Sequence, residues 1–193
     1  MKLLSFKNNK NSSFGLLEDQ YIIDLKHYFG PNINSLKEAL NILPNNFEFS
    51  KLNKMSKLKI DDIEFLPPII DPGKIICVGV NYESHRLETK RKENLYPTIF
   101  TRFFESQVGH LENIIVSKKS YKLDYEGELA VIIGKKGKNL SVQNAMSIVA
   151  GYSCYNDATV RDWQKHSSQF TPGKNFDGTG AFGPCLVTKD EIK

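Results

Sequence analysis

The sequence predicts an α+β protein, mostly β, in which a small N-terminal β-rich domain precedes a larger β-rich unit. Short apolar runs separated by turn residues fill the first third of the chain, which favours several short strands. The diproline Pro67-Pro68, followed by Asp71-Pro72-Gly73, then marks a break. We therefore expect a domain over residues 1–66, a linker over 67–73 and the larger unit over 74–193. The 193 residues suffice for a sizeable core.

Three strands and one helix are expected in the small domain. The strands lie at Leu3 to Phe6, Phe14 to Leu17 and Tyr21 to Leu25, with Asn-rich or acidic turns between them. The segment Ser35-Leu-Lys-Glu38 has the spacing of a capping box, which opens a helix. That helix should run through Leu40 and Ile42 and end at Pro44 and Asn45-Asn46.

Further strands are expected in the larger unit wherever apolar, β-branched residues are continuous. Lys74 to Val80 is apolar on both faces, which predicts a central strand. The other predicted strands are Pro97 to Phe104, Ile114 to Val116, Leu129 to Ile133 as a buried strand, and Gly151 to Tyr155.

Two helices are expected between and after these strands. Ser141 is a suitable N-cap for a helix with a core-facing apolar stripe at helical spacing, formed by Val142, Ala145, Met146 and Val149. Thr159 is a suitable N-cap for a second helix, and Asp162 at its third position would interact favourably with the helix dipole.

Two glutamates stand just before the most apolar of these strands. Because side chains alternate along a strand, Glu126 and Glu128 share a face with Ala130 and Ile132 and lie about 6.6 Å apart along the strand. Two such charges repel by roughly 2.5 kcal/mol at an effective dielectric of about 20. A hard divalent cation such as Mg²⁺ would relieve this repulsion. The alternative is a solvated strand end on which the glutamates pair with lysines.

Other candidate residues lie near strand ends. If residues 83–88 are helical, His85 and Glu88 lie on one face and can share a proton. The charged tract that follows, up to Asn94, indicates a mobile lid. The alternative is a surface helix without function. Asp157 follows a strand and precedes a helix, where it is either a functional acid or a turn residue. Lys174 is the only cation in the glycine-rich stretch from Pro172 to Pro184.

Composition excludes several classes of protein. A hydrophobic content of 40% with 25% charged residues is ordinary for a globular protein, and the scattered net charge of +4 argues weakly for small anionic substrates and against nucleic acid. Three distant cysteines form neither a disulfide framework nor a Cys-x-x-Cys metal site, which favours a reducing, cytoplasmic location. We expect no signal peptide and no membrane span.

Four motifs in this order resemble the fumarylacetoacetate hydrolase family: Val78-Gly-Val-Asn-Tyr-x-x-His-x-x-Glu88, Asp124-Tyr-Glu-Gly-Glu-Leu-Ala130, Tyr155-Asn-Asp-x-Thr-x-Arg-Asp-Trp-Gln164 and Gly173-Lys-Asn-Phe-Asp177. The resemblance covers about residues 73 to 193. It implies a mixed β-roll, here incomplete, usually dimeric, with a Mg²⁺ or Mn²⁺ ion. The family's metal carboxylates correspond to Glu126, Glu128 and Asp157.

The resemblance also implies roles for further residues. His85 and Glu88 match a lid dyad that activates water or shuttles a proton, and Lys174 matches a lysine that holds or polarises the bound oxo acid. The remaining matches are to substrate-binding residues, namely Arg102, Arg161 and Gln164. Arg102 stands where many members have a lysine, and Phe103-Phe-Glu105 replaces a Pro/Ser-containing turn.

The function implied is divalent-metal-dependent hydrolytic or lytic cleavage of a C–C bond in a small 2-oxo or β-diketo acid by a homodimer. The alternatives are a 2-hydroxydienoate isomerase or oxaloacetate-type decarboxylase on the same site, or an impaired fragment that only binds metal or a partner. Family members resemble this chain but continue past Lys193 with further strands. We therefore expect a truncated homologue, gene fragment or piece of a split protein that is weakly active and prone to aggregate.

Overall fold

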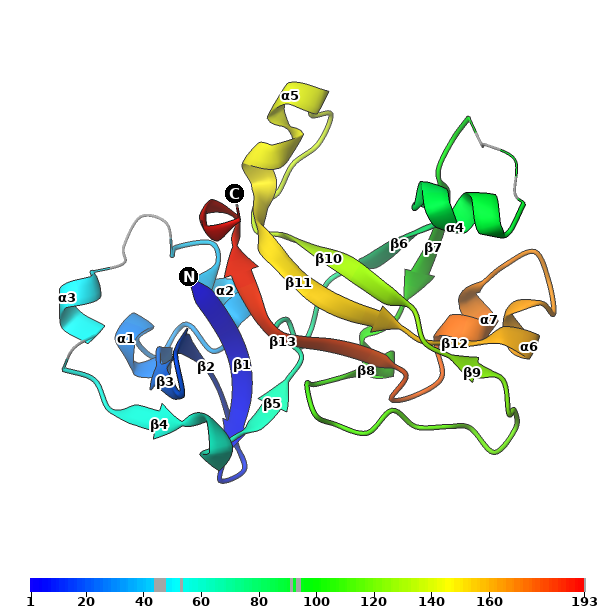
Figure 1. Cartoon of the computed structure of the whole chain (residues 1–193). Helices are drawn as coiled ribbons and strands as arrows, with labels where there is room; N and C mark the ends of the chain where they lie inside the picture. Colours follow the sequence, from blue (N-terminus) through cyan, green and yellow to red (C-terminus); the bar gives the residue numbers. More distant parts are fainter. Residues whose placement is uncertain (44–47, 53, 91, 93–94, 193) are drawn as a thin grey trace.

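A computed structural model gives the fold of the chain and describes residues 1–43, 48–52, 54–90, 92 and 95–192 (Figure 1). The strands are β1 Lys2–Asn8, β2 Asn11–Glu18, β3 Tyr21–Asp24, β4 Lys57–Lys59, β5 Glu64–Leu66, β6 Ile75–Gly79, β7 Thr98–Arg102, β8 Gln107–Val108, β9 Leu123–Asp124, β10 Gly127–Ile133, β11 Val149–Asp157, β12 Thr159–Val160 and β13 Gly180–Thr188. The α-helices are α1 Lys26–Phe29, α2 Leu36–Ala39, α3 Phe49–Leu52, α4 Glu83–Glu88, α5 Val142–Ala145, α6 Arg161–Gln164 and α7 Thr171–Lys174, and the 3₁₀ helices are η1 Ile60–Asp62, η2 Phe104–Ser106, η3 Met146–Ile148 and η4 Lys189–Glu191. The prediction of a mostly β, α+β fold is confirmed.

One large sheet joins the beginning of the chain to its end. Its strand order is β10-β11-β13-β1-β2-β3-β4, with β5 paired to β1 and β8 paired to β13. β1 runs antiparallel to β13, with Leu3 opposite Leu186, so the strands of residues 1–66 continue the sheet formed by the later strands (Figure 1). The division into two domains with a linker at 67–73 stays a prediction.

The main core lies under the N-terminal half of this sheet. Leu3, Phe14 and Leu25 are completely buried, and they pack with Leu36 of α2 and Leu186 of β13. The three strands predicted before residue 26 are present as β1, β2 and β3, and each has consecutive buried residues because the two faces of the sheet pack into two apolar clusters.

The capping box predicted for α2 is present in part. The Ser35 hydroxyl accepts a hydrogen bond from the Glu38 amide at 3.3 Å, as the motif requires. The Glu38 carboxylate accepts from the Asn34 amide at 2.6 Å, one residue earlier than the N-cap. The predicted stop at Pro44 and Asn45-Asn46 lies outside the described residues.

Two predicted buried strands are exposed on one face. β6 is paired with β7 in a separate two-stranded sheet, and Ile76 and Val78 are exposed, so the prediction of a central strand is wrong. β10 is an edge strand of the large sheet, and Leu129, Val131 and Ile133 are 60%, 48% and 56% exposed. A continuous apolar run marks a strand, but neighbouring elements decide whether both faces are covered.

Three smaller predictions are also corrected. The apolar stripe after Ser141 does not face the core, since Val142 and Met146 are 87% and 54% exposed and the chain returns to a strand at Val149. Residues 114–116 form no strand. Thr159 lies within the short strand β12, and α6 has Val160 as its N-cap. Among the residues described, no helix has the length and apolar character needed to span a bilayer.

Candidate active site

The candidate site is built at the point where β10 begins and β11 ends. Glu126 directly precedes β10, and Asp157 is the last residue of β11. The Asp157 amide donates to the Glu126 carbonyl at 2.9 Å, and the Glu126 amide donates to Asn156 Oδ1 at 3.0 Å. These bonds hold the two acidic residues side by side at the end of the sheet.

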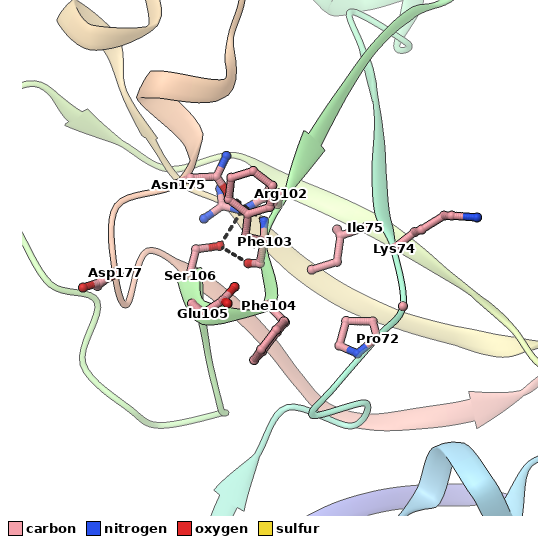
Figure 2. A pocket seen from close by; sticks show the side chains of 11 residues that line it. Pro72, Lys74, Ile75, Arg102, Phe103, Phe104, Glu105, Ser106, Asn175 and Asp177 are labelled. Atoms are coloured by element: carbon pink, nitrogen blue, oxygen red, sulfur yellow. Dashed lines mark hydrogen bonds between the residues drawn. The ribbon is translucent and has the colours of Figure 1, made fainter.

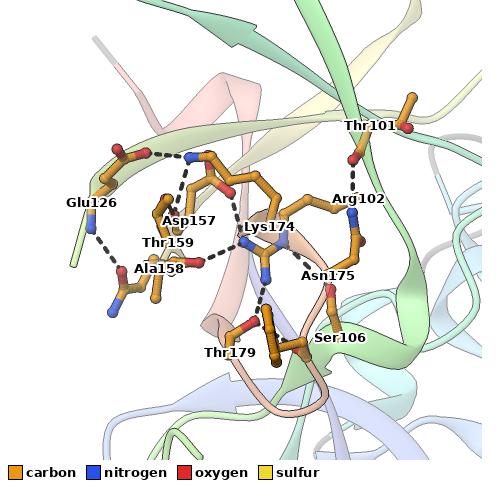
Figure 3. Close-up of polar contacts among 12 residues, drawn as sticks. Thr101, Arg102, Ser106, Glu126, Asp157, Ala158, Thr159, Lys174, Asn175 and Thr179 are labelled. Carbon is orange, nitrogen blue, oxygen red and sulfur yellow. Dashed lines mark hydrogen bonds and ion pairs between the residues drawn. The ribbon is translucent and has the colours of Figure 1, made fainter. Parts of the chain in front are cut away.

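Lys174 lies between the two carboxylates (Figure 3). It ends the short helix α7, and its side chain is only 2% exposed. Its Nζ is 2.5 Å from Glu126 Oε2 and 2.6 Å from Asp157 Oδ2. The structure therefore brings together three predicted site residues, namely Glu126, Asp157 and Lys174. The ion pair between Glu126 and Lys174 agrees with one part of the alternative interpretation, in which the glutamates pair with lysines.

Arg102, at the end of β7, supports the same cluster from the protein interior. Its side chain is fully buried, and Nη1 donates to Asp157 Oδ1 at 2.7 Å and to the Ala158 carbonyl at 3.1 Å (Figure 3). Nη2 donates to Thr179 Oγ1 at 2.8 Å, and Nε donates to Ser106 Oγ at 3.4 Å. The structure thus places this predicted substrate-binding residue behind Asp157, in contact with protein groups.

Arg161 and Gln164 of α6 border the cluster on the other side. Arg161 Nη2 lies 2.6 Å from Glu126 Oε1 and 2.8 Å from Asp124 Oδ2. Its Nη1 donates to Gln164 Oε1 at 3.1 Å. The Arg161 side chain is 28% exposed, so this cation, unlike Arg102, can be reached from solvent.

The pKa values of the two glutamates are shifted in opposite directions. Burial raises the pKa of Glu126, but the hydrogen bond and charge of Lys174, with Arg161, outweigh it, so the pKa is lowered. Burial also raises the pKa of Glu128, and the charges of Glu126 and Asp157 raise it further. Glu128 therefore interacts electrostatically with Glu126 and Asp157, as its position on the same strand face as Glu126 predicts.

The carboxylate oxygens of the cluster are the donors available to a divalent metal ion. In the part of the chain that the structure describes, no group of three or more His, Cys, Asp and Glu side chains is close enough to hold one. Two carboxylates nevertheless converge on a single point that a cation takes, and oxygen donors of this kind suit Mg²⁺ or Mn²⁺. The chemistry of Glu126 and Asp157 fits such an ion, while the ligand set with Glu128 stays a prediction.

The predicted dyad lies on a helix beside the cluster. Residues 83–88 form α4, so His85 and Glu88 have the helical spacing on which the prediction depends. Both side chains are exposed. Tyr82, the N-cap of α4, hydrogen-bonds Glu128 and slightly lowers its pKa, which ties this helix to the acidic strand. The tract proposed as a lid lies partly outside the described residues.

Sequence reasoning missed the residues that support the cluster. Asp124 pairs with Arg161, and Ser106 and Thr179 accept hydrogen bonds from Arg102. Asn175, directly after Lys174, donates to the Thr101 carbonyl and accepts from the Phe103 amide, which joins α7 to β7. Asp124 lies in a quoted motif and could have been singled out. Thr179 and Asn175 have partners more than 70 residues away, and Ser106 is a lone serine four residues after Arg102, so no local motif identifies them.

A cavity of about 360 Å³ lies next to Arg102 (Figure 2). Pro72, Lys74 and Ile75 form one side, and Phe104 and Glu105 form the other. The cavity is lined by neither Glu126 nor Asp157. Arg102 also lines the cavity, so it is the one predicted site residue that the cavity shares with the acidic cluster.

The sequence model described as fumarylacetoacetate (FAA) hydrolase C-terminal matches residues 74–193. The chain belongs to the fumarylacetoacetate hydrolase family. The mitochondrial oxaloacetate tautomerase fahd2 of Xenopus laevis is 37% identical over 201 residues, which cover 100% of this chain and 63% of the relative. The chain thus spans less than two thirds of the length of that relative.

Solved structures show the same fold. The fumarylacetoacetate hydrolase of Exiguobacterium antarcticum is 35% identical with a TM-score of 0.83, over 100% of this chain and 68% of that one. The maleylpyruvate hydrolase of Sphingobium sp. SYK-6, solved with manganese(II) and pyruvate, has a TM-score of 0.81 over 100% of this chain and 69% of that one. At 21% identity, this second likeness shows the fold alone. The predicted family fold is confirmed.

Proposed function

We propose that this site carries out metal-dependent enol chemistry on a small 2-oxo acid, with tautomerisation of an oxaloacetate-like diacid as its simplest form. The observation that carries the proposal is the convergence of Glu126 and Asp157 on one cation-binding point beside the accessible Arg161. The name of the Xenopus relative supports the choice of a tautomerase.

The residues that would hold the metal are Glu126, Asp157 and Glu128. A bound Mg²⁺ or Mn²⁺ would supply Lewis-acid polarisation of the 2-oxo group. Arg161 is the cation that can receive the substrate carboxylate, because its guanidinium is partly exposed and presents several donors. Gln164 orients that guanidinium through the 3.1 Å bond to Nη1.

Proton transfer falls to His85 and Glu88. A general base must take the proton from the carbon next to the carbonyl, and the neutral imidazole of His85 offers a nitrogen that can accept it. Glu88, one helical turn later, would stabilise the protonated ring. The Lys174 ammonium would stabilise negative charge that develops on the substrate oxygen.

Hydrolytic C–C cleavage of an acylpyruvate is the second candidate, and it needs the same enolate as leaving group. The specific observation in its favour is that His85 and Glu88 are both exposed, so that water can reach them for activation. Homodimer formation and a cytoplasmic location stay predictions, and the Xenopus relative is named mitochondrial.

Oxaloacetate and an acylpyruvate, each with Mn²⁺, test the two candidates. The enol form of oxaloacetate absorbs in the ultraviolet, so tautomerisation is followed as the approach to the keto–enol equilibrium. His85→Ala should lower kcat by roughly 10² to 10⁴ with Mn²⁺ affinity unchanged, because a general base contributes about that much. Exposed Glu112→Gln serves as a control. Full activity of His85→Ala would remove the dyad from the mechanism.

A further inference from the structure

Each of the two acids in the cluster is held at both of its carboxylate oxygens. The outer oxygens contact arginines, since Arg161 binds Glu126 Oε1 at 2.6 Å and Arg102 binds Asp157 Oδ1 at 2.7 Å. The inner oxygens share one partner, because Lys174 Nζ contacts both Glu126 Oε2 and Asp157 Oδ2 (Figure 3). The described part of the site therefore has a single cation at its shared inner point.

Arg102 cannot leave its position easily. Its guanidinium is completely buried and bonded to the Asp157 carboxylate, the Ala158 carbonyl and the hydroxyls of Thr179 and Ser106. Those hydroxyls donate their own protons to the Phe176 and Phe103 carbonyls, so they are left to accept from the arginine. Acceptors therefore surround the planar guanidinium at Nε, Nη1 and Nη2, and these bonds keep Arg102 paired with Asp157 Oδ1.

Lys174 is held differently. Its ammonium is a compact charge at the end of a flexible chain, and its short contacts are the two inner oxygens. In the same position Nζ lies 4.9 Å from the centroid of the Phe100 ring, whose face attracts an ammonium. Because no rigid fork of donors fixes the ammonium, rotation of the flexible lysine side chain can carry it away from the acids.

A divalent ion at this point would need the same oxygens. An ion held by Glu126 and Asp157 would compete with the Lys174 ammonium for the inner oxygens of these acids. Arg102 and Arg161 already occupy the outer oxygens. Two cations cannot share this space, so one must leave when the other binds.

We propose that Lys174 is a displaceable internal counter-ion: it neutralises Glu126 and Asp157 in the metal-free protein, and a divalent metal ion binds only by exchange with its ammonium. Arg102, which is completely buried, is the permanent counter-ion of Asp157. This inference rests on the proposed function, because it takes the two acids as the metal site. It adds that metal loading frees the Lys174 ammonium for an anionic substrate.

Mn²⁺ binding to the full chain, measured by electron paramagnetic resonance of the free ion, tests the exchange. Lys174→Met removes the competitor, so it should bind Mn²⁺ at least about tenfold more tightly than the wild-type chain. Lys165→Met is the matched control: it makes the same charge change at an exposed lysine after α6 and should shift affinity by less than about twofold. Circular dichroism confirms that each variant is folded.

The wild-type chain provides a second measurement that needs no variant. Lys174 is buried, so acetylation by an amine-selective reagent, followed by mass spectrometry, should be slow. Mn²⁺ should increase its rate relative to Lys165. The exchange is refuted, and the metal site is not, if wild type binds Mn²⁺ but Lys174→Met binds it no more tightly. The same holds if Mn²⁺ slows the acetylation of Lys174. If neither protein binds Mn²⁺, the metal site of the proposed function fails as well.

Discussion

Replacing Arg102 by methionine should destabilise the protein severely. The change leaves the Asp157 carboxylate without its 2.7 Å partner on one side, in a place where both side chains are almost fully buried. Breaking a buried ion pair by removing one partner costs about 3 to 5 kcal/mol. The Ala158 carbonyl and the Thr179 hydroxyl also lose a donor, at about 1 kcal/mol each. The loss is comparable to a typical total stability of about 5 to 15 kcal/mol.

Urea unfolding, followed by the fluorescence of Trp163, measures this loss. Trp163 is the one tryptophan of the chain and packs edge-on against Phe176, close to the cluster. Arg102→Lys keeps the charge but not the fork of donors, so it should cost about 1 to 2 kcal/mol.

Lys7→Met is the control for this series. Its ion pair with Glu64 joins two exposed side chains, so its loss should cost less than about 1 kcal/mol. An Arg102→Met variant as stable as wild type would refute the supporting role given to Arg102.

Three further predictions concern the acidic strand and the cysteines. Glu128→Gln should raise the free energy of unfolding of the metal-free protein by about 0.5 kcal/mol, because burial and the neighbouring acids disfavour the charged form of Glu128. The gain is small because water screens this half-buried side chain. A urea midpoint below that of wild type would contradict this prediction. At pH 8, iodoacetamide should alkylate exposed Cys154 at least about tenfold faster than Cys77. Burial, and next the charge of Asp157, raise the pKa of the Cys77 thiol to about 12, so little of the reactive thiolate is present. Equal rates in peptide mass spectra would contradict this prediction. Val131→Lys, on the exposed face of edge strand β10, should reduce self-association in light scattering; unchanged scattering would show that this face is not the adhesive one.

The sequence allowed the strands to be located more reliably than their surroundings. The short apolar runs bounded by turn residues are local information, and they predicted β1, β2 and β3 correctly. The exposure of β6 and β10 could not be predicted, because an apolar run is the same whether a neighbouring element covers it or not. That decision is made by tertiary packing.

The structure brings several of the predicted site residues together, but the sequence did not indicate how they pair. Period-two spacing correctly placed Glu126 near Glu128, and the strand-end position of Asp157 brought it beside them. Nothing local indicated that Lys174, many residues later, would take the point between two acids. Nor did the sequence indicate that Arg102 would be buried behind Asp157, because its partners come from three other segments.

The proposed function depends on divalent-ion binding at the Glu126–Asp157 centre and on the use of that ion on a 2-oxo acid. Enol-to-keto conversion of oxaloacetate by the purified chain, with Mn²⁺ or with excess EDTA, tests this most directly. We predict conversion above the buffer rate with Mn²⁺, lost in EDTA and lost in Asp157→Asn, which keeps the shape of the side chain but removes its charge. Conversion that persists unchanged in EDTA, or in Asp157→Asn with Mn²⁺, would contradict the claim.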